Sequence, residues 1–421
     1  MAKNSFFGFL ASIKIAFIII FVLSNVLGAE GSTKNVIVST QDDLPGMVES
    51  AVSGTIFLLK DGIYKLNRPI IVGNPGVSIQ SESGDRNKVI LDGNMGTGEL
   101  KRENCVNEII SVKASDVVIQ DISICHARDH GLHISPKHEG NIRNVIIRNI
   151  HLYDCGQQLI KVNSNGGDPL FWTEDSVLED SLIEFIDSSI MHDMGTHFYT
   201  GGIDVHGGKN WHIRRNVFRN IQREGKMMEH AIHMWSRSRG TIVEQNTFID
   251  CYRAIGFGMK REASGLTRNY SDGKGHDPYF DHVEGIIRNN FIFNRKGIHL
   301  ETGIELMNVI DVKVHHNTVV SQDEPFSSIE YRWPNTRVEI INNIVSQTIM
   351  ERNNAKAHLM SNIENADINI FNGYESGDLH LISTAEQAIG NGMKIKETSY
   401  DIDNELRDAN PDIGADEYLH P

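Results

Sequence analysis

The chain has 421 residues, of which 40% are hydrophobic and 23% charged, and its formal net charge at pH 7 is -15. A chain of this length can bury a large core, but its acidity makes it a poor candidate for general nucleic-acid binding, so we expect no nucleic-acid partner. Its four cysteines include no CxxC pair and no metal-type Cys/His spacing, which excludes the common cysteine zinc sites.

Residues 1–29 have the features of a secretory signal peptide. Lys3 and Lys14 accompany a dense apolar run over residues 15–23, and small residues follow at Gly28 and Ala29. A retained membrane anchor is the alternative. No later stretch has the roughly 18 apolar residues that a membrane helix needs. We therefore expect a secreted or periplasmic protein without stable membrane insertion.

Residues 30–110 predict an N-terminal cap and the first coils of a repeated β-structure. Residues 55–64 form an apolar strand followed by a turn at Asp61-Gly62, and residues 69–72 and 77–79 are further short strands. A solenoid needs a cap over the exposed end of its core. This stretch can supply the cap at the N-terminus.

An Asn or Asp recurs eight times inside the same short phrase, at intervals of 26 to 44 residues. A fixed phrase at this period indicates stacked repeats. The phrase is β-branched and contains a turn-forming residue, so the repeat unit is a strand and not a helix. We expect these anchors to stack in one column and to hydrogen-bond along it. They are Asp121, Asn149, Asp180, Asn216, Asn246, Asn290, Asn317 and Asn343.

A second strand is predicted between consecutive anchors, with the form small or apolar, apolar, variable, apolar. This alternation buries one face. Two or more short strands in each coil, without a helical period, predict an all-β parallel β-helix. We expect its central coils over residues 111–350 and the C-terminal coils and cap over residues 351–421, within one domain. The predicted inward column is Ile203, Ile232, Ile255, Ile304 and Ile329.

Three features together resemble the pectate-lyase-like superfamily. They are the phrase Val89-Ile90-Leu91-Asp92-Gly93, the eight coils, and the Asp-Ile-Gly-Ala-Asp-Glu-Tyr sequence over residues 412–418. More closely, the chain is similar to secreted bacterial right-handed parallel β-helix repeat proteins. The resemblance implies a single-stranded right-handed parallel β-helix (solenoid) with N- and C-terminal caps. It implies no single activity, because the superfamily includes lyases, hydrolases, epimerases and adhesive proteins.

No catalytic set known from the superfamily matches this chain residue by residue. The β-helix chondroitinase and alginate lyases carry a Lys base and an Arg on consecutive coils, beside calcium-binding Asn and Glu. The best-matching coils here, residues 232–235 and 255–258, have neither Lys nor Arg. The paired-aspartate and Gly-His-Gly motifs of the polygalacturonase-type hydrolases are absent too.

If the Ile and Val of the second strand point inward, the residues between them point outward in two columns. Neighbouring coils lie about 4.8 Å apart, and we expect these side chains to be accessible. Gly256 and Gly258 predict a notch, with close approach by a covering loop as the alternative. The first column is His133, Lys161, Asp204, His233, Gly256, Glu305, Glu330; the second is Ser135, Asn163, His206, Trp235, Gly258, Met307, Arg332.

His206 and His233 are the best candidates for a catalytic base, because an unperturbed His titrates near neutral pH. We expect Asp204, one coil from His233, to orient that imidazole and raise its pKa. Lys161 is an alternative base. Arg237 is a candidate to neutralise a substrate carboxylate, since guanidinium pairs with it bidentately. The candidates for substrate binding are Tyr199, Trp235, Arg239, Arg253, Arg332, Gly256 and Gly258.

Two further expectations concern a metal and a disulfide. Glu305 and Glu330 stack on neighbouring coils, so either a shared Ca²⁺ ion or Arg332 compensates their charge. Cys105 and Cys125 are candidates for a disulfide in an oxidising compartment, and buried thiols are the alternative.

The leading hypothesis for the function is a secreted lyase that cleaves a uronic-acid polysaccharide by β-elimination. The outward columns offer a base and a cation, which are the groups that β-elimination needs. A non-catalytic carbohydrate-binding or surface β-helix is the main alternative, and a polyuronate C5-epimerase is the third. In each case we expect an acidic polysaccharide as the partner and a monomeric protein.

Overall fold

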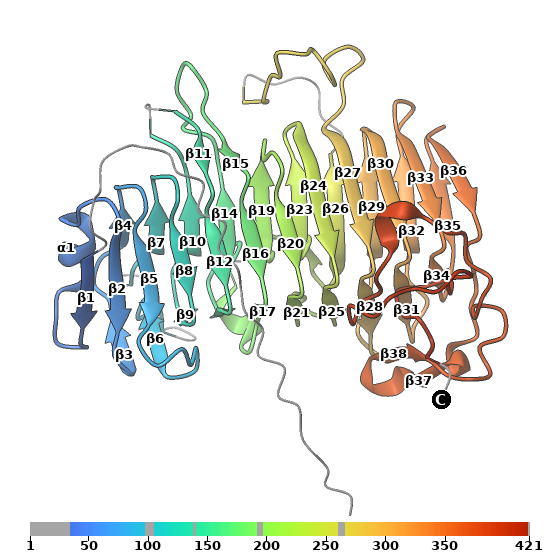
Figure 1. Ribbon diagram of the computed structural model, residues 1–421, viewed down its shortest axis with the longest axis horizontal. Coiled ribbons are helices and arrows are strands. Elements are labelled where there is room, and N and C mark those ends of the chain that lie inside the picture. The colour runs from blue at the N-terminus through green and yellow to red at the C-terminus, as the bar shows by residue number, and fades with distance from the viewer. Residues whose placement is uncertain (1–33, 97–104, 138–139, 192–196, 260–265, 420–421) are drawn as a thin grey trace, which may run out of the picture. The chain divides into compact units, whose positions relative to one another are not determined.

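In a computed structural model of the chain, three long parallel sheets wind around one hydrophobic core (Figure 1). The structure describes residues 34–96, 105–137, 140–191, 197–259 and 266–419. The prediction of an all-β, right-handed parallel β-helix is confirmed. The predicted signal peptide lies outside the described residues.

The first sheet, sheet A, contains twelve strands of the described residues, all paired in parallel with the neighbouring coil. Buried positions alternate with partly buried ones in strands such as Thr55–Leu59. Sheet A consists of β1 (Lys34–Val38), β2 (Thr55–Leu59), β5 (Ser78–Ser81), β8 (Val118–Gln120), β12 (Ile146–Arg148), β16 (Val177–Glu179), β20 (His212–Arg214), β24 (Ser238–Glu244), β27 (His282–Arg288), β30 (Val309–His315), β33 (Arg337–Ile341) and β36 (Lys356–Met360).

The second sheet, sheet B, follows sheet A in each coil after a turn of a few residues. The outer side of its last strands packs against the C-terminal segment in a separate apolar cluster that includes Phe293, Ile344 and Ile413 (Figure 1). Sheet B consists of β3 (Gly62–Lys65), β6 (Val89–Asp92), β9 (Ser123–Cys125), β13 (His151–Tyr153), β17 (Leu182–Glu184), β21 (Val217–Arg219), β25 (Thr247–Ile249), β28 (Phe291–Asn294), β31 (Thr318–Ser321) and β34 (Ile344–Val345).

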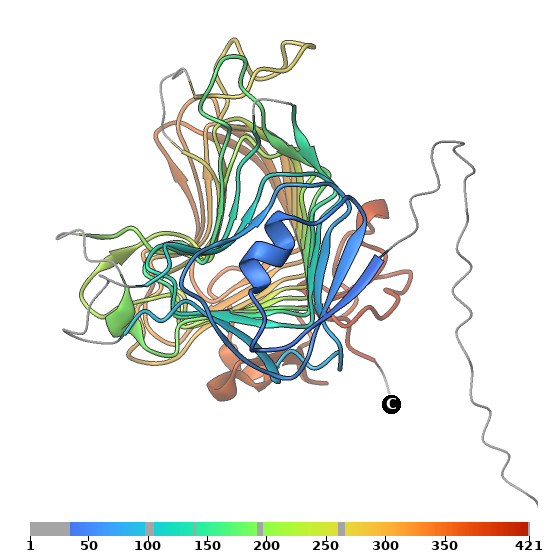
Figure 2. The ribbon, with the colours of Figure 1, turned by 90° about the vertical axis from the view of Figure 1, so that its left-hand side faces the viewer.

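The third sheet, sheet C, contains the strands predicted between consecutive anchors and further strands before and after them. Chain segments project at two corners of the coil, as the view along the axis shows (Figure 2). Sheet C consists of β4 (Ile70–Val72), β7 (Glu108–Val112), β10 (His130–Ile134), β14 (Ile160–Val162), β19 (Ile203–His206), β23 (Ile232–Trp235), β26 (Arg253–Gly258), β29 (Thr302–Met307), β32 (Ser327–Arg332) and β35 (Ile349–Arg352).

The remaining elements are short. The helix α1 (Leu44–Glu49) lies over the N-terminal opening of the coil, where its Leu44 and Val48 are buried (Figure 2). The predicted N-terminal cap is therefore present. The others are β11 (Ile142–Arg143), β15 (Thr173–Glu174), η1 (Ser188–Ile190), β18 (His197–Phe198), β22 (Met227–Met228), η2 (Ile368–Ile370), β37 (Phe371–Gly373), η3 (Tyr374–Ser376), β38 (Asp378–Leu381) and η4 (Lys396–Thr398).

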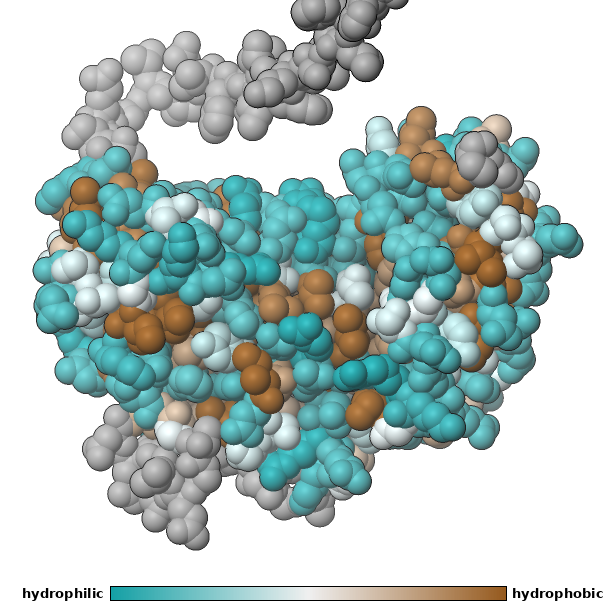
Figure 3. Space-filling model, turned by 90° about the horizontal axis from the view of Figure 1, so that it is seen from below, coloured by the Kyte–Doolittle hydropathy of each residue, from teal (hydrophilic) through white to brown (hydrophobic). Residues whose placement is uncertain are grey.

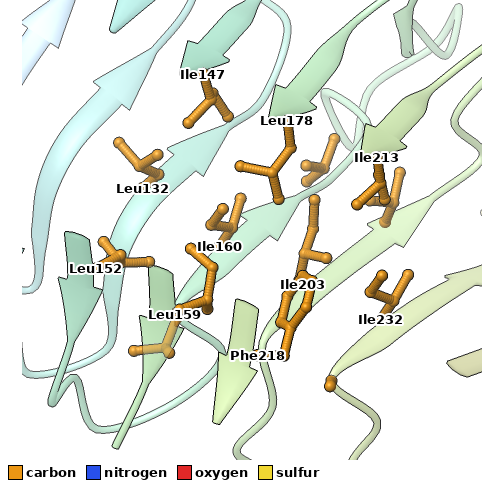
Figure 4. Packing of buried hydrophobic residues seen from close by; sticks show 14 of the residues in the cluster. Leu132, Ile147, Leu152, Leu159, Ile160, Leu178, Ile203, Ile213, Phe218 and Ile232 are labelled. Atoms are coloured by element: carbon orange, nitrogen blue, oxygen red, sulfur yellow. The ribbon is translucent and has the colours of Figure 1, made fainter. Parts of the chain in front are cut away.

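The inward column of sheet C confirms the predicted alternation. Ile203 pairs with Ile232, which pairs with Ile255, and the register continues to Ile304 and Ile329. All five side chains are fully buried. Figure 4 shows the first of these residues meeting apolar side chains from sheets A and B inside the coil. This packing fixes which side chains of sheet C must face outward.

The anchor residues occupy two columns, and the predicted single column is wrong. Asp121, Asn149 and Asp180 hold the left-handed position of the turn between sheets A and B, with φ of 58°, 47° and 56°. From Asn216 onward the anchor is the next residue, and each amide donates to the anchor of the following coil at 2.9–3.1 Å. Asn and Asp suit both positions, so the phrase alone did not distinguish them.

Among the described residues the cysteines form no disulfide, and the proposed Cys105–Cys125 bridge is wrong. Cys125, Cys155 and Cys251 are fully buried. Burial raises the pKa of the Cys155 and Cys251 thiols. The alternative of buried thiols is therefore confirmed for these three residues.

One face of the described region is mostly polar. Seen from below, hydrophobic residues occur in small separate groups on a largely hydrophilic face (Figure 3). Within the described ranges, no helix combines the length and apolar composition needed to cross a membrane.

Candidate functional site

The outward face of sheet C carries the two predicted columns in the predicted order. Lys161 lies opposite Asp204, and Asp204 lies opposite His233 on the next coil. In the second column His206 lies opposite Trp235. The register follows from the inward Ile column, because side chains alternate between the two faces of a strand. The sequence therefore predicted which of these residues are neighbours.

The expectation that the first column is accessible is wrong. Lys161 and Asp204 are each 5% exposed, His233 is 4%, and Glu305 and Glu330 are 2% and 1%. The charged side chains of the first column pair with charged neighbours, and larger side chains cover them. The Trp235 ring, for example, stacks parallel to the His233 ring at 5.3 Å between centroids. The more accessible groups are Tyr199, Trp235 and His206, whose side chain is 19% exposed.

Lys161 is the centre of the best-connected cluster on this face. Its Nζ donates to Asp204, to the Tyr199 hydroxyl at 2.7 Å and to His206 Nε2 at 3.1 Å. These three acceptors use all three protons of an ammonium group. Trp235 Nε1 donates to the other carboxylate oxygen of Asp204 at 2.6 Å. Five side chains from three coils and one loop are thus held in a fixed arrangement.

Lys161 and Asp204 are both ionised at neutral pH. Burial alone would raise the pKa of Asp204, but the positive charge of Lys161, together with His206 and His233, outweighs it and holds that pKa well below its usual range. Burial alone would lower the pKa of Lys161, but the charge of Asp204, together with Tyr199 and the hydrogen bonds to both residues, outweighs it and raises that pKa. Lys161 is therefore a fixed cation, and the suggestion that it serves as a neutral base loses its physical support.

His233 does not have the raised pKa expected from Asp204. Its Nδ1 is 4.0 Å from Asp204 Oδ1, while its Nε2 donates to the Gly258 carbonyl at 3.1 Å. Burial lowers the pKa of His233, with a smaller contribution from the neighbouring His230, and the attraction of Asp204 is too weak to reverse this. A buried imidazole beneath Trp235 does not face a polymer in solvent, so His206 is the better placed of the two bases.

The predicted notch at Gly256 is filled. A Cβ atom on Gly256 would lie 2.6 Å from two ring atoms of His230, so the missing side chain makes room for that imidazole. Gly258 has a φ of +73°, and a Cβ there would lie 2.0 Å from the Met307 carbonyl oxygen. Gly256 makes room for the covering His230 ring, and Gly258 allows a positive φ and the close approach of the Met307 carbonyl. These close approaches agree with the alternative to an open notch.

The candidate arginines do not converge on the Lys161 cluster. Arg237 is buried and donates to the Arg268 carbonyl at 2.8 Å, where burial lowers its pKa. Arg239 pairs with Glu284 at 2.7 Å, and Arg253 pairs with Glu301. These groups already have partners within the protein.

Glu305 and Glu330 lie opposite each other and are compensated by arginine. Arg332 lies 2.5 Å from Glu305 and 3.3 Å from Glu330, and Arg352 lies 2.9 Å from Glu330. His230 Nε2 is 2.7 Å from the other oxygen of Glu305. These contacts favour charge compensation by Arg332 over compensation by a shared Ca²⁺ ion. Calcium binding stays a prediction.

Sequence analysis did not single out His230. It lies two residues before β23 and contacts His233 with 4.7 Å between ring centroids. The signal that could have found it is the Glu229-His230-Ala231-Ile232-His233 sequence, in which two imidazoles and a carboxylate occur within five residues.

Comparison with solved structures confirms the pectate-lyase-like β-helix fold. The pectate lyase Pel9A has a TM-score of 0.57 at 13% identity, covering 92% of this chain and 97% of that one. XylC in complex with xylose has a TM-score of 0.52 at 10% identity, covering 91% and 98%. An alginate lyase from Paenibacillus sp. has a TM-score of 0.50 at 15% identity, covering 76% and 98%. No family model and no curated protein sequence matches the chain.

Proposed function

We propose that the protein is a secreted polysaccharide-active β-helix, and specifically a lyase that cleaves a uronic-acid polymer by β-elimination. The observation that carries the proposal is the cluster of Lys161, Tyr199 and His206 on the outward face of sheet C. It combines a fixed cation with two titratable groups within 3.1 Å of its Nζ.

In this reaction a base removes the C5 proton of a uronate, the C4–O bond breaks, and a C4–C5 double bond forms. The leaving oxygen takes up a proton. Lys161 would stabilise the negative charge that develops on the substrate carboxylate. Tyr199 and His206, the accessible titratable groups, would exchange the protons. Trp235 offers an aromatic face beside them, with its ring centroid 4.2 Å from that of His206.

A hydrolase fits the cluster less well. Glycoside hydrolysis uses two carboxyl groups about 5–9.5 Å apart, one of them protonated. The depressed pKa of Asp204 keeps it ionised. Glu305 is three coils away, at about 14 Å for a 4.8 Å coil spacing. The substrates in the names of the similar structures, pectate and alginate, also support a uronate polymer.

Non-catalytic carbohydrate binding is the second candidate, because all three donors of Lys161 already have protein acceptors. A C5-epimerase would use the same proton abstraction without breaking the C4–O bond. Ultraviolet absorbance of the new double bond separates the three. A lyase produces it on pectate, alginate or a glycosaminoglycan, an epimerase changes only the sugar composition, and a binder does neither.

We expect Tyr199→Phe to lower kcat by about 100-fold on the substrate that this screen identifies, since a positioned proton-transfer group contributes about 10²–10⁴-fold. Tyr400→Phe is the matched control, because Tyr400 is 51% exposed. Both variants are assayed for kcat, KM and melting temperature. Full activity of Tyr199→Phe would assign the chemistry to another group.

Secretion is part of the proposal and rests on residues 1–29. We expect mass spectrometry of the exported protein to find a new N-terminus after Gly28 or Ala29. An exported or membrane-bound chain that still begins at Met1 would favour the retained anchor.

A further inference from the structure

Glu229, His230 and His233 form a compact group beside the Lys161 cluster. One carboxylate oxygen and one nitrogen of each ring lie within 4.8 Å of one another. Both imidazoles are at least nine-tenths buried, while Glu229 is partly exposed. The two imidazoles therefore form the buried side of the group, and Glu229 forms the side that reaches solvent.

In both rings the hydrogen bond is made by Nε2, and within the described residues Nδ1 makes none. His230 Nε2 contacts the Glu305 carboxylate at 2.7 Å, and His233 Nε2 donates to the Gly258 carbonyl at 3.1 Å. Donation through Nε2 places the lone pair on Nδ1. The Nδ1 of His230 is buried and has no hydrogen-bond partner among the residues that the structure describes. A buried polar atom without a partner is unfavourable, and a bound ligand would offset this cost.

We propose that Glu229, His230 and His233 bind a divalent transition-metal ion of the zinc class. Two imidazoles and one carboxylate are a donor set that Zn²⁺ accepts, with a fourth position left for water or another ligand. Ca²⁺ is disfavoured, since it prefers six to eight oxygen ligands. Metal-binding imidazoles usually donate their second ring N–H to a carboxylate or a backbone carbonyl, which orients the ring. Glu305 and the Gly258 carbonyl accept these hydrogen bonds here.

Another described group shows why this one is distinguished. Ligand atoms of His380, Asp403 and Asp416 also lie within 4.8 Å of one another. There, however, His380 contacts Asp378 through Nδ1 at 2.5 Å and Asp403 through Nε2 at 2.8 Å. Hydrogen bonds to Asp403 and Asp378 raise the pKa of His380 to about 9, so this imidazole is protonated and has no lone pair for a metal.

The test is a metal titration of the full-length protein without a histidine tag, after treatment with a chelator. We expect one Zn²⁺ per chain in competition with a chromophoric chelator, and a visible d–d spectrum of low-coordinate Co²⁺ on substitution. Glu229→Gln should weaken Zn²⁺ binding at least about tenfold. Glu224→Gln is the matched control, since Glu224 is exposed on the same connection and should leave the affinity unchanged.

His230→Gln provides a second variant, and its melting temperature is measured first because the residue is buried. Glu229→Gln remains informative if His230→Gln does not fold. The proposal is overturned if the chelator-treated protein binds no stoichiometric Zn²⁺. It is equally overturned if Glu229→Gln binds Zn²⁺ as tightly as Glu224→Gln, which would place the metal in another group. The readout is binding, so its outcome is independent of lyase activity.

Discussion

Asp204→Asn is expected to destabilise the protein by about 3–5 kcal/mol at pH 7, because it leaves the buried ammonium of Lys161 without a counter-charge. The Lys161 side chain is 6% exposed, so water cannot replace the lost carboxylate. The expected readout is a lower midpoint of urea unfolding at an unchanged slope. Lys161→Met should cause a loss of similar size through the opposite orphaned charge.

The double variant Lys161→Met/Asp204→Leu is the control for this prediction. Replacing a buried ion pair with apolar residues is often close to neutral, so the double variant should be more stable than either single variant. The carboxyl pKa is depressed in the folded protein, so its stabilisation is present above the ordinary value of about 3.9 and is lost as the pH falls further. The gap between wild type and Asp204→Asn should therefore close only in acid. Equal midpoints at pH 7 would contradict the prediction.

The sequence predicted the register of sheet C but not the environment of its outward side chains. Alternation follows from burying Ile203 and its equivalents, and one residue of slippage would expose the whole column. Which outward groups pair with one another depends on rotamers and on the loops that cover them. Tyr199 reaches Lys161 from 38 residues away, and no local pattern encodes that contact.

The anchor residues show a second limit of prediction from the sequence. The same phrase, a strand followed by Asn or Asp, serves two positions of one turn. The left-handed position favours these residues because their side chains tolerate positive φ. The inward position favours Asn because its amide both donates and accepts along the stack. Asn149 and Asn216 therefore share a sequence context and differ in structure.

The second prediction with a large expected effect is that the pair Glu305–Glu330 makes the stability of the protein depend on pH. Burial and the negative charge of Glu305 raise the pKa of Glu330 to about 7, although Arg352 opposes the shift. Burial acts in the same direction on Glu305, but His230 and Arg332 outweigh it and lower that pKa. The pair therefore holds one shared proton in weakly acidic solution, and both carboxylates ionise only above neutrality.

The sign of the pH effect follows from the proton balance. Glu330 has a higher pKa in the folded than in the unfolded chain, so its contribution is fully present below the unfolded value near 4.5 and is lost as the pH rises through about 7. The shift corresponds to about 3–4 kcal/mol as an upper limit, at 1.36 kcal/mol per pKa unit. We expect wild-type stability to fall over this interval by an amount that Glu330→Gln abolishes.

Urea midpoints measured between pH 4.5 and 8 test this expectation, with Glu351→Gln as the control. Glu351 lies on the adjacent strand β35 and is exposed, so its replacement should leave the pH profile of the wild type unchanged. Glu330→Gln keeps a neutral hydrogen-bonding side chain beside Glu305 and should be the more stable protein at pH 8. Parallel profiles for the wild type and Glu330→Gln would show that the two carboxylates do not share a proton, and that Arg332 and Arg352 hold both in the ionised form.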